Sequence, residues 1–194
     1  DDYNVEHIIR TDVFRKYGVK NIGILHGVPT YPPVLAQRRY LSFDVYFVSG
    51  REWYERFYAD RWPKKMEIEP AGSFGMSRND LHRLKEPRPN DIIVYIKHCF
   101  QDNETFQFIR DIADEFSDRK VYVKAKQMRE GDFLVGLANL FKDGPINIIE
   151  SHDDPYELLF KGSYVFSDPS SMVLEGIQYG FITFAIISKD GWAS

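Results

Sequence analysis

The fold is decided by one apolar run in the middle of the chain, Asp91-Ile92-Ile93-Val94-Tyr95-Ile96. A continuous run without polar alternation is typical of a parallel strand that is buried on both faces of its sheet. Downstream, apolar residues recur at three- and four-residue spacings between Phe106 and Phe116, which predicts an amphipathic helix. A buried strand followed by such a helix is the repeating unit of an α/β fold.

The same alternation continues to the C-terminal end of the sequence. Right-handed crossovers between successive parallel strands would build a doubly wound sheet, so residues 91–194 are predicted to form one Rossmann-like domain. We predict its further strands at 121–124, 146–149, 164–166 and 181–187, and its further helices at 133–141, 155–160 and 171–179.

The N-terminal part shows a shorter version of this pattern. A helical stretch to Tyr17 precedes strand candidates at 21–25 and 43–49, and an aromatic helix follows at 53–58. Residues 1–83 are predicted to be the end of a second Rossmann-like domain that lacks its first strands, and residues 84–90, with two prolines, to be a linker. Because the chain starts without a strand of its own and stops just after an apolar run, we expect it to be part of a longer enzyme.

Composition narrows the classes of protein that remain open. Of the 194 residues, 43% are hydrophobic and 15% aromatic, as in a folded globular protein. The net charge of -4 gives no basic footprint of the kind that binds nucleic acid, so no nucleic-acid partner is expected. The single cysteine, Cys99, excludes an internal disulfide and a cysteine-rich zinc site. No apolar run approaches the ~20 residues that span a bilayer, so we expect a soluble or peripheral protein.

The strongest candidate site follows the strand predicted at 164–166. It reads Ser167-Asp168-Pro169-Ser170-Ser171 and opens a helix, whose first amide groups and serine hydroxyls can point at an anion. Glu175 lies one helical turn past Ser171 and could accept hydrogen bonds from ribose hydroxyls. The alternative is that the serines only cap a helix and that Glu175 is solvated.

A second candidate is His26-Gly27, which follows the strand predicted at 21–25. A histidine at the end of a strand is placed for proton transfer at neutral pH, and the glycine lets a ligand come close. A purely structural histidine is the alternative. No HExxH, CxxC or GxxxxGK[ST] motif occurs, so we expect neither a metal nor a P-loop and no cofactor.

Two further loops supply cations. In the segment Gly72–Asp80, glycines such as Gly75 allow close backbone approach, and Arg78 offers a planar cation that fits phosphate. Its alternative is a turn with an Arg-Asp ion pair. Lys124 and Lys126 come just after Val121 to Val123 of a predicted strand, where an ammonium could neutralise a leaving phosphate; a solvated surface pair is the alternative.

The order of these loops resembles that of a known family. The segments that carry the resemblance are His26-Gly27, Asp44-x-Tyr46-x-Val48-Ser49, Gly75-Met76-Ser77-Arg78-Asn79-Asp80 and Ser167-Asp168-Pro169-Ser170-Ser171 with Glu175. Together they look like the CDP-glycerol glycerophosphotransferase family and the related capsule and teichoic-acid glycosyltransferases of the GT-B fold. The resemblance implies an α/β, GT-B-like architecture of two Rossmann-like halves with parallel sheets. It implies that His26 acts as the catalytic base and that Ser170 and Ser171 bind the phosphate of the donor.

The chain departs from the family in two places. Members usually carry Lys-x-His-Pro where this chain has Lys124-Ala125-Lys126-Gln127, so the histidine is missing. The expected Pro-Thr-x-Arg segment is replaced by Lys97-His98-Cys99-Phe100. Because Glu175 sits where many GT-B enzymes keep a ribose-binding glutamate, a nucleotide-sugar donor is favoured over CDP-glycerol.

The functional expectation is a metal-independent glycosyltransferase. It would move a sugar from a nucleotide-activated donor to a bacterial cell-surface polysaccharide or its lipid-linked precursor, in the cytoplasm or peripherally on the inner face of the cell membrane. The donor site would comprise Ser170, Ser171, Glu175, Arg78, Lys124, Gly75 and Asp168, with His26 catalytic and Gly27 on the acceptor side. The alternatives are a CDP-glycerol-type polyol-phosphate transferase, a nucleotide-sugar epimerase, and a non-catalytic carbohydrate-binding or scaffold domain of the same fold.

Overall fold

The chain forms two compact units, Asp1–Phe74 and Gly75–Ser194. The structure, a computed structural model, describes residues 6–25, 41–73, 75–96, 102–125, 132–140, 142, 146–149, 154–168 and 170–187. The division between the units falls ahead of the linker expected at 84–90. Each unit has its own parallel sheet and its own core.

The N-terminal unit is built on a three-stranded parallel sheet in the order β1-β2-β3. Its strands are β1 (Ile22–Ile24), β2 (Val45–Val48) and β3 (Glu67–Pro70), and its helices are α1 (Glu6–Lys16) and α2 (Arg51–Phe57). The first two strands are confirmed, whereas β3 is not predicted from the sequence. Its core is aromatic: Tyr46 is fully buried and meets Trp62 edge-on at 5.2 Å, and Tyr58 stacks on Trp62 at 4.4 Å.

One carboxylate ties α1 to this sheet. Asp44, just before β2, accepts a hydrogen bond from the backbone N–H of Asn21 and another from Arg15 Nε, each at 2.8 Å. These two bonds, the backbone one first, hold the pKa of Asp44 below its usual range. The end of α1 and the starts of β1 and β2 are thereby fixed together.

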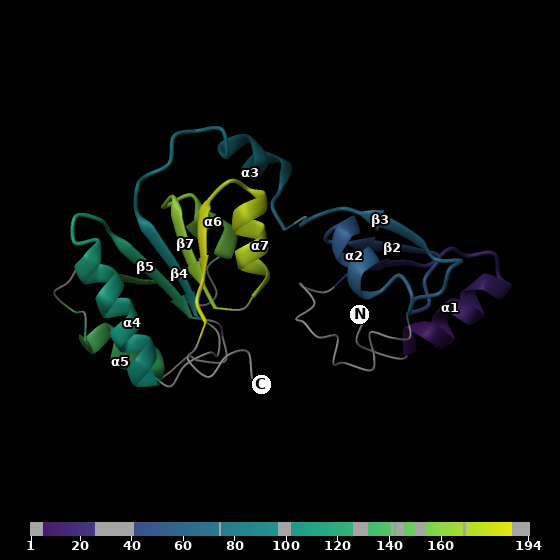
Figure 1. The fold of residues 1–194 in the computed structure, drawn as a ribbon, viewed down its shortest axis with the longest axis horizontal. Coiled ribbons are helices and arrows are strands. Elements are labelled where there is room, and N and C mark those ends of the chain that lie inside the picture. Colours follow the sequence, from purple (N-terminus) through teal and green to yellow (C-terminus); the bar gives the residue numbers. More distant parts are fainter. Residues whose placement is uncertain are drawn as a thin grey trace. The chain divides into compact units, whose positions relative to one another are not determined.

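The C-terminal unit is a doubly wound α/β domain, as the sequence predicts. Its five strands are all parallel, in the order β6-β5-β4-β7-β8 (Figure 1). The strands are β4 (Ile92–Ile96), β5 (Val121–Ala125), β6 (Ile146–Ile149), β7 (Tyr164–Ser167) and β8 (Ile182–Ala185). The helices are α3 (Arg78–Arg83), α4 (Asp102–Glu115), α5 (Asp132–Leu140), α6 (Pro155–Leu159) and α7 (Ser171–Gln178).

The central strand β4 separates two cores. All of its residues are buried, and they alternate between the faces of the sheet. Ile92, Val94 and Ile96 face a core that α4 and α5 complete, whereas Ile93 and Tyr95 face a core completed by α6 and α7. Figure 1 shows these two helix pairs on opposite sides of the strands. The two parallel sheets are consistent with the partial GT-B-like organisation expected from the sequence.

Residues 75–90, which include the segment expected to be a linker, belong to the C-terminal unit. Helix α3 begins at Arg78 and is capped by a reciprocal pair, in which Ser77 Oγ accepts from the Asp80 amide and Asp80 accepts from the Ser77 amide. Further along, the Arg88 guanidinium lies 4.1 Å from the centre of the Phe181 ring and donates to the Gly180 carbonyl. The segment 84–90 therefore packs on this unit through Arg88.

A glycine sets the close pairing at the start of β7. Gly162 is buried, and a side-chain carbon there would collide with the carbonyl oxygen of Asp91. That same oxygen accepts the Ser163 amide at 3.0 Å. The missing side chain therefore lets β7 reach its register on β4, and this register carries Ser167 to the end of the sheet.

We expect Gly162→Ala to destabilise the C-terminal unit by about 1–3 kcal/mol, because the backbone of Asp91 cannot yield as a flexible side chain would. Gly136→Ala in α5 is the control: its added carbon meets only the ring of Phe106, at 3.2 Å, and it gains up to about 1 kcal/mol of helix propensity. Urea unfolding followed by circular dichroism measures both. Equal unfolding midpoints for Gly162→Ala and the wild type would contradict the close approach.

Candidate functional site

The sheet of the C-terminal unit changes winding direction between β4 and β7. From β4 the chain moves outward through β5 and β6, then returns to place β7 and β8 on the other side of β4. In open parallel sheets, ligands bind at the carboxyl ends of the strands at such a switch point. The segment that follows β7, from Ser167 to Ser171, lies at this point.

Ser170 is the N-cap of α7, and its hydroxyl is committed inside the protein. Its Oγ accepts the Met172 amide at 3.2 Å and lies 3.0 Å from Ser167 Oγ. Ser167 gives its only hydroxyl proton to the Asp168 carbonyl at 2.9 Å, so Ser170 must be the donor in the contact between the two serines. The proton of Ser170 is therefore not available to an anion in this arrangement.

Ser171 is the serine that remains open. The Met172 amide bonds to Ser170 Oγ and the Val173 amide to the Ser170 carbonyl, so both are occupied. The hydroxyl and backbone N–H of Ser171, which is partly exposed, make no hydrogen bond with the described part of the chain. They stand at the positive end of the α7 dipole. Of the three serines in the segment 167–171, Ser171 has the geometry of an anion ligand.

Glu175 is buried, which rules out the alternative that it is solvated. Its side chain is 7% exposed, and Oε2 accepts a hydrogen bond from the phenol of Tyr156 on α6 at 2.5 Å. The other oxygen, Oε1, makes no hydrogen bond with any described residue. One carboxylate oxygen is thus fixed by α6, while the second can accept a hydrogen bond.

A row of polar residues crosses the same face of the sheet. Lys124 on β5 is in register with Tyr95 on β4, and Tyr95 is in register with Ser167 on β7. Lys124 is only 7% exposed, so the interpretation as a solvated surface lysine is wrong for it. Lys126 lies outside the described residues. The row ends at Ser167, directly before the segment that leads into α7, and Lys124 lies at its other end on β5.

Tyr95 fixes the start of α6. Its hydroxyl donates to the carbonyl oxygen of Pro155 at 2.6 Å. Burial raises the pKa of Tyr95 well above its usual range, and the nearby Glu175, Tyr156 and Asp154 raise it further. The phenol therefore stays protonated across the physiological range and acts as a permanent donor to α6.

Gly75 lies directly against the hydroxyl of Tyr156. A side-chain carbon at position 75 would occupy the place of that hydroxyl and of its ring carbon. The close approach expected for this glycine is therefore to a tyrosine of the same unit. Tyr156 is a site residue that no sequence motif indicates, because α6 offers only one aromatic residue in an ordinary amphipathic segment.

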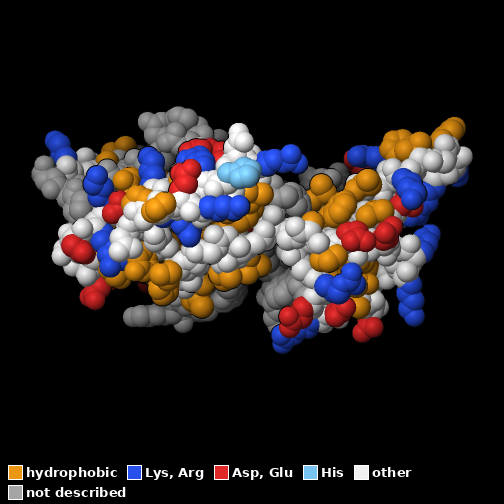
Figure 2. All heavy atoms as spheres, turned by 90° about the horizontal axis from the view of Figure 1, so that it is seen from above, with side chains coloured by type: hydrophobic (Ala, Val, Ile, Leu, Met, Phe, Trp, Pro, Cys, Tyr) orange, Lys and Arg blue, Asp and Glu red, His pale blue; other side chains and the backbone are white. Residues whose placement is uncertain are grey.

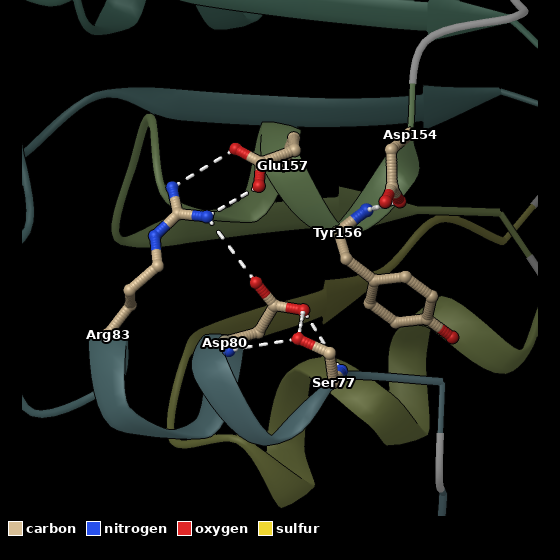
Figure 3. A network of polar contacts seen from close by, with 6 residues as sticks. All are labelled: Ser77, Asp80, Arg83, Asp154, Tyr156 and Glu157. Atoms are coloured by element: carbon tan, nitrogen blue, oxygen red, sulfur yellow. Dashed lines mark hydrogen bonds and ion pairs between the residues drawn. The ribbon is translucent and has the colours of Figure 1, made fainter.

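Helix α3 is pinned to α6 by a small charged network (Figure 3). Arg83 donates two hydrogen bonds to Glu157, at 2.5 and 3.1 Å, and also pairs with Asp80 at 3.4 Å. The Arg83 guanidinium lowers the pKa of Glu157, while hydrogen bonds from Ser77 lower that of Asp80. In Figure 3 the ring of Tyr156 lies on the Ser77 side of this network, away from Arg83.

Asp80 forms an ion pair, but not the one within Gly72–Asp80 that was the alternative to a phosphate-binding loop. Asp80 pairs with Arg83, whereas Arg78 is exposed at the first position of α3 and makes no hydrogen bond or ion pair with the described residues. Figure 2 shows one face on which cationic and acidic side chains are interspersed.

The structure thus brings together part of the predicted site. Six of the predicted residues lie around the switch point or pack against it: Gly75, Lys124, Asp168, Ser170, Ser171 and Glu175. Asp168 is buried, and its amide extends the pairing with β4 by donating to the Tyr95 carbonyl at 3.2 Å. His26 and Gly27 lie outside the described residues. Tyr95, Tyr156 and Ser167 are additions that sequence analysis missed.

No group of three or more His, Cys, Asp and Glu side chains in the described residues is arranged to hold a metal ion. Nor does any helix within the same ranges combine the length and hydropathy needed to cross a membrane.

Comparison with known proteins gives a likeness to solved structures. No protein-family model matches the sequence, and no curated protein matches it. A solved structure described as "OtsA apo structure" is similar at 14% identity and a TM-score of 0.47, covering 87% of this chain and 52% of that one. The chain spans about half the length of that protein. At this identity and TM-score the likeness carries no argument about activity.

We expect Gly75→Ala to destabilise the C-terminal unit by about 1–3 kcal/mol, because the added carbon displaces the Tyr156 hydroxyl. In a Tyr156→Ala background the same change has room, and its effect should be smaller by at least ~1 kcal/mol. A double-mutant cycle on unfolding free energies measures the coupling. Additive effects would show that Gly75 and Tyr156 are not in contact.

Proposed function

We propose that this chain is the donor-binding part, with a portion of the acceptor-side part, of a glycosyltransferase that uses a nucleotide-activated sugar. The observation that supports this best is the set of groups at the β4/β7 switch point. An uncommitted hydroxyl and amide of Ser171 stand there at the start of a helix, with the buried Glu175 one turn further along it and the buried Lys124 in the same row of the sheet as Ser167. Phosphates and ribose, the common parts of nucleotide donors, need these groups.

The donor diphosphate would lie at the start of α7. The Ser171 amide and hydroxyl donate to its oxygens, and the helix dipole favours its charge. Lys124 supplies a cation from β5, and the exposed Arg78 supplies a second one from α3. These groups stabilise the charge that develops on the leaving nucleotide as the sugar departs.

The ribose would bind one helical turn further along α7. Glu175 Oε1 accepts hydrogen bonds from the ribose hydroxyls, while Oε2 stays with Tyr156. Asp168 and Ser170 would support the site indirectly. Asp168 continues the pairing of β7 with β4, and Ser170 caps α7, the helix that carries Ser171 and Glu175.

The catalytic base would come from the N-terminal unit. His26, which follows β1, would take the proton of the acceptor hydroxyl, and Gly27 would let the acceptor approach. The resemblance to capsule and teichoic-acid enzymes supports a cell-surface polysaccharide, or its lipid-linked precursor, as that acceptor. Transfer requires no metal in this scheme, because the helix start and the two cations supply the positive charge.

Nucleotide binding tests the donor site. Isothermal calorimetry with ADP, GDP, UDP and CDP should detect one preferred nucleotide, and Glu175→Gln should weaken it about tenfold, since a neutral amide replaces a charged acceptor. Glu104→Gln is the matched control, because this exposed glutamate lies on α4, on the other face of the sheet. Absence of binding by the folded chain would overturn the proposal and favour a scaffold domain.

A transfer assay on the full-length protein with the preferred nucleotide sugar tests the base. His26→Ala should abolish turnover, because no group then removes the acceptor proton, while nucleotide affinity stays within about twofold. His82→Ala serves as the control, since His82 is exposed on α3. Unchanged turnover would remove His26 from the mechanism.

A further inference from the structure

We propose that Tyr156 is a positioning residue that makes the donor site selective for ribose over deoxyribose. This rests on the proposed function and adds a residue to which no motif assigns a role. The proposal is based on the 2.5 Å hydrogen bond from the Tyr156 phenol to Glu175 Oε2, which leaves Oε1 without a hydrogen bond to the described residues.

The phenol restricts the carboxylate to one orientation. Glu175 is almost fully buried, so water does not compete strongly for its oxygens. Rotation of the carboxylate away from Tyr156 would break a charge-assisted hydrogen bond. Oε1 therefore keeps a fixed direction before any ligand binds, and a sugar hydroxyl finds an acceptor already in place.

Tyr156 is itself held from several sides. The Asp154 side chain accepts its amide at 2.8 Å, and the Tyr95 phenol holds the preceding carbonyl, that of Pro155, at 2.6 Å. One residue further along α6, Glu157 is clamped by Arg83. These contacts fix the short helix from which the phenol projects (Figure 3).

Gly75 closes the remaining side. Because it lacks a side chain, the backbone can lie against the Tyr156 hydroxyl, which cannot move towards it. The hydroxyl is thereby confined between Gly75 and Glu175. Helix α6, the segment before α3 and helix α7 thus all contribute to the direction of one carboxylate oxygen.

The test compares sugars in the nucleotide, since Oε1 acts only on ribose hydroxyls. The probes are the preferred nucleotide among ADP, GDP, UDP and CDP, and its 2′-deoxy and 2′,3′-dideoxy forms, measured by calorimetry on the intact chain. The wild type should bind the ribonucleotide at least about tenfold more tightly than the dideoxy form. Tyr156→Phe should weaken the ribonucleotide about tenfold and leave the dideoxy form within about twofold.

Tyr122→Phe is the matched control, because this phenol on β5 packs against the same core and makes no hydrogen bond with the described residues. It should change neither affinity. Gly75→Ala provides a second route should Tyr156→Phe fold poorly: it displaces the hydroxyl while keeping the tyrosine, and it should reduce the same discrimination. Thermal unfolding of each variant confirms that the compared proteins are folded.

The outcomes separate the two proposals. If the wild type binds no nucleotide, both the proposed function and this inference are wrong. If the wild type prefers ribose but Tyr156→Phe weakens ribo and dideoxy forms equally, or neither, then Tyr156 is only structural and the donor site stands. If the wild type binds both forms equally, Glu175 does not contact the sugar, and the positioning role of Tyr156 is overturned.

Discussion

Burial of β4 on both faces is the constraint from which the C-terminal unit follows. None of Ile92 to Ile96 reaches solvent appreciably, so strands must flank β4 and helices must cover both faces. Parallel neighbours require right-handed crossovers, which put the connecting helices on one face when strands are added in one direction and on the other face in the other direction. Covering both faces therefore requires neighbours on both sides of β4, which are β5 and β7. The switch point between β4 and β7 is therefore a direct consequence of the burial of this one strand.

The candidate site shows how a fold and a binding function share the same groups. Ser170 stabilises α7 through its side chain and so gives up its proton to the protein, while Ser171, one residue later, keeps its own. Glu175 likewise divides its two oxygens between Tyr156 and the ligand side. In each case one polar group stabilises the fold, while an adjacent group remains available to a ligand.

The sequence predicts the C-terminal fold well because long apolar runs and helical spacing are strong local signals. The strand at 91–96 and the helix opened by Ser170 follow from such patterns. Helix α3 was missed although Ser77 and Asp80 have capping-box spacing, because the nearby glycines and prolines favoured a loop. Tyr156 could not be found at all: its partner Glu175 is distant in sequence, and only packing brings a phenol on α6 to a carboxylate on α7.

The direction of the proton between Ser170 and Ser167 limits what position 170 can accept. Because the Ser170 proton points towards Ser167, the Ser170 hydroxyl offers no proton to a ligand and carries no net charge. Aspartate caps helices as well as serine does, yet there it would set a negative charge beside the groups that await an anion. Natural variation at position 170 should therefore be limited to neutral capping residues such as threonine and asparagine, even though aspartate would cap the helix equally well.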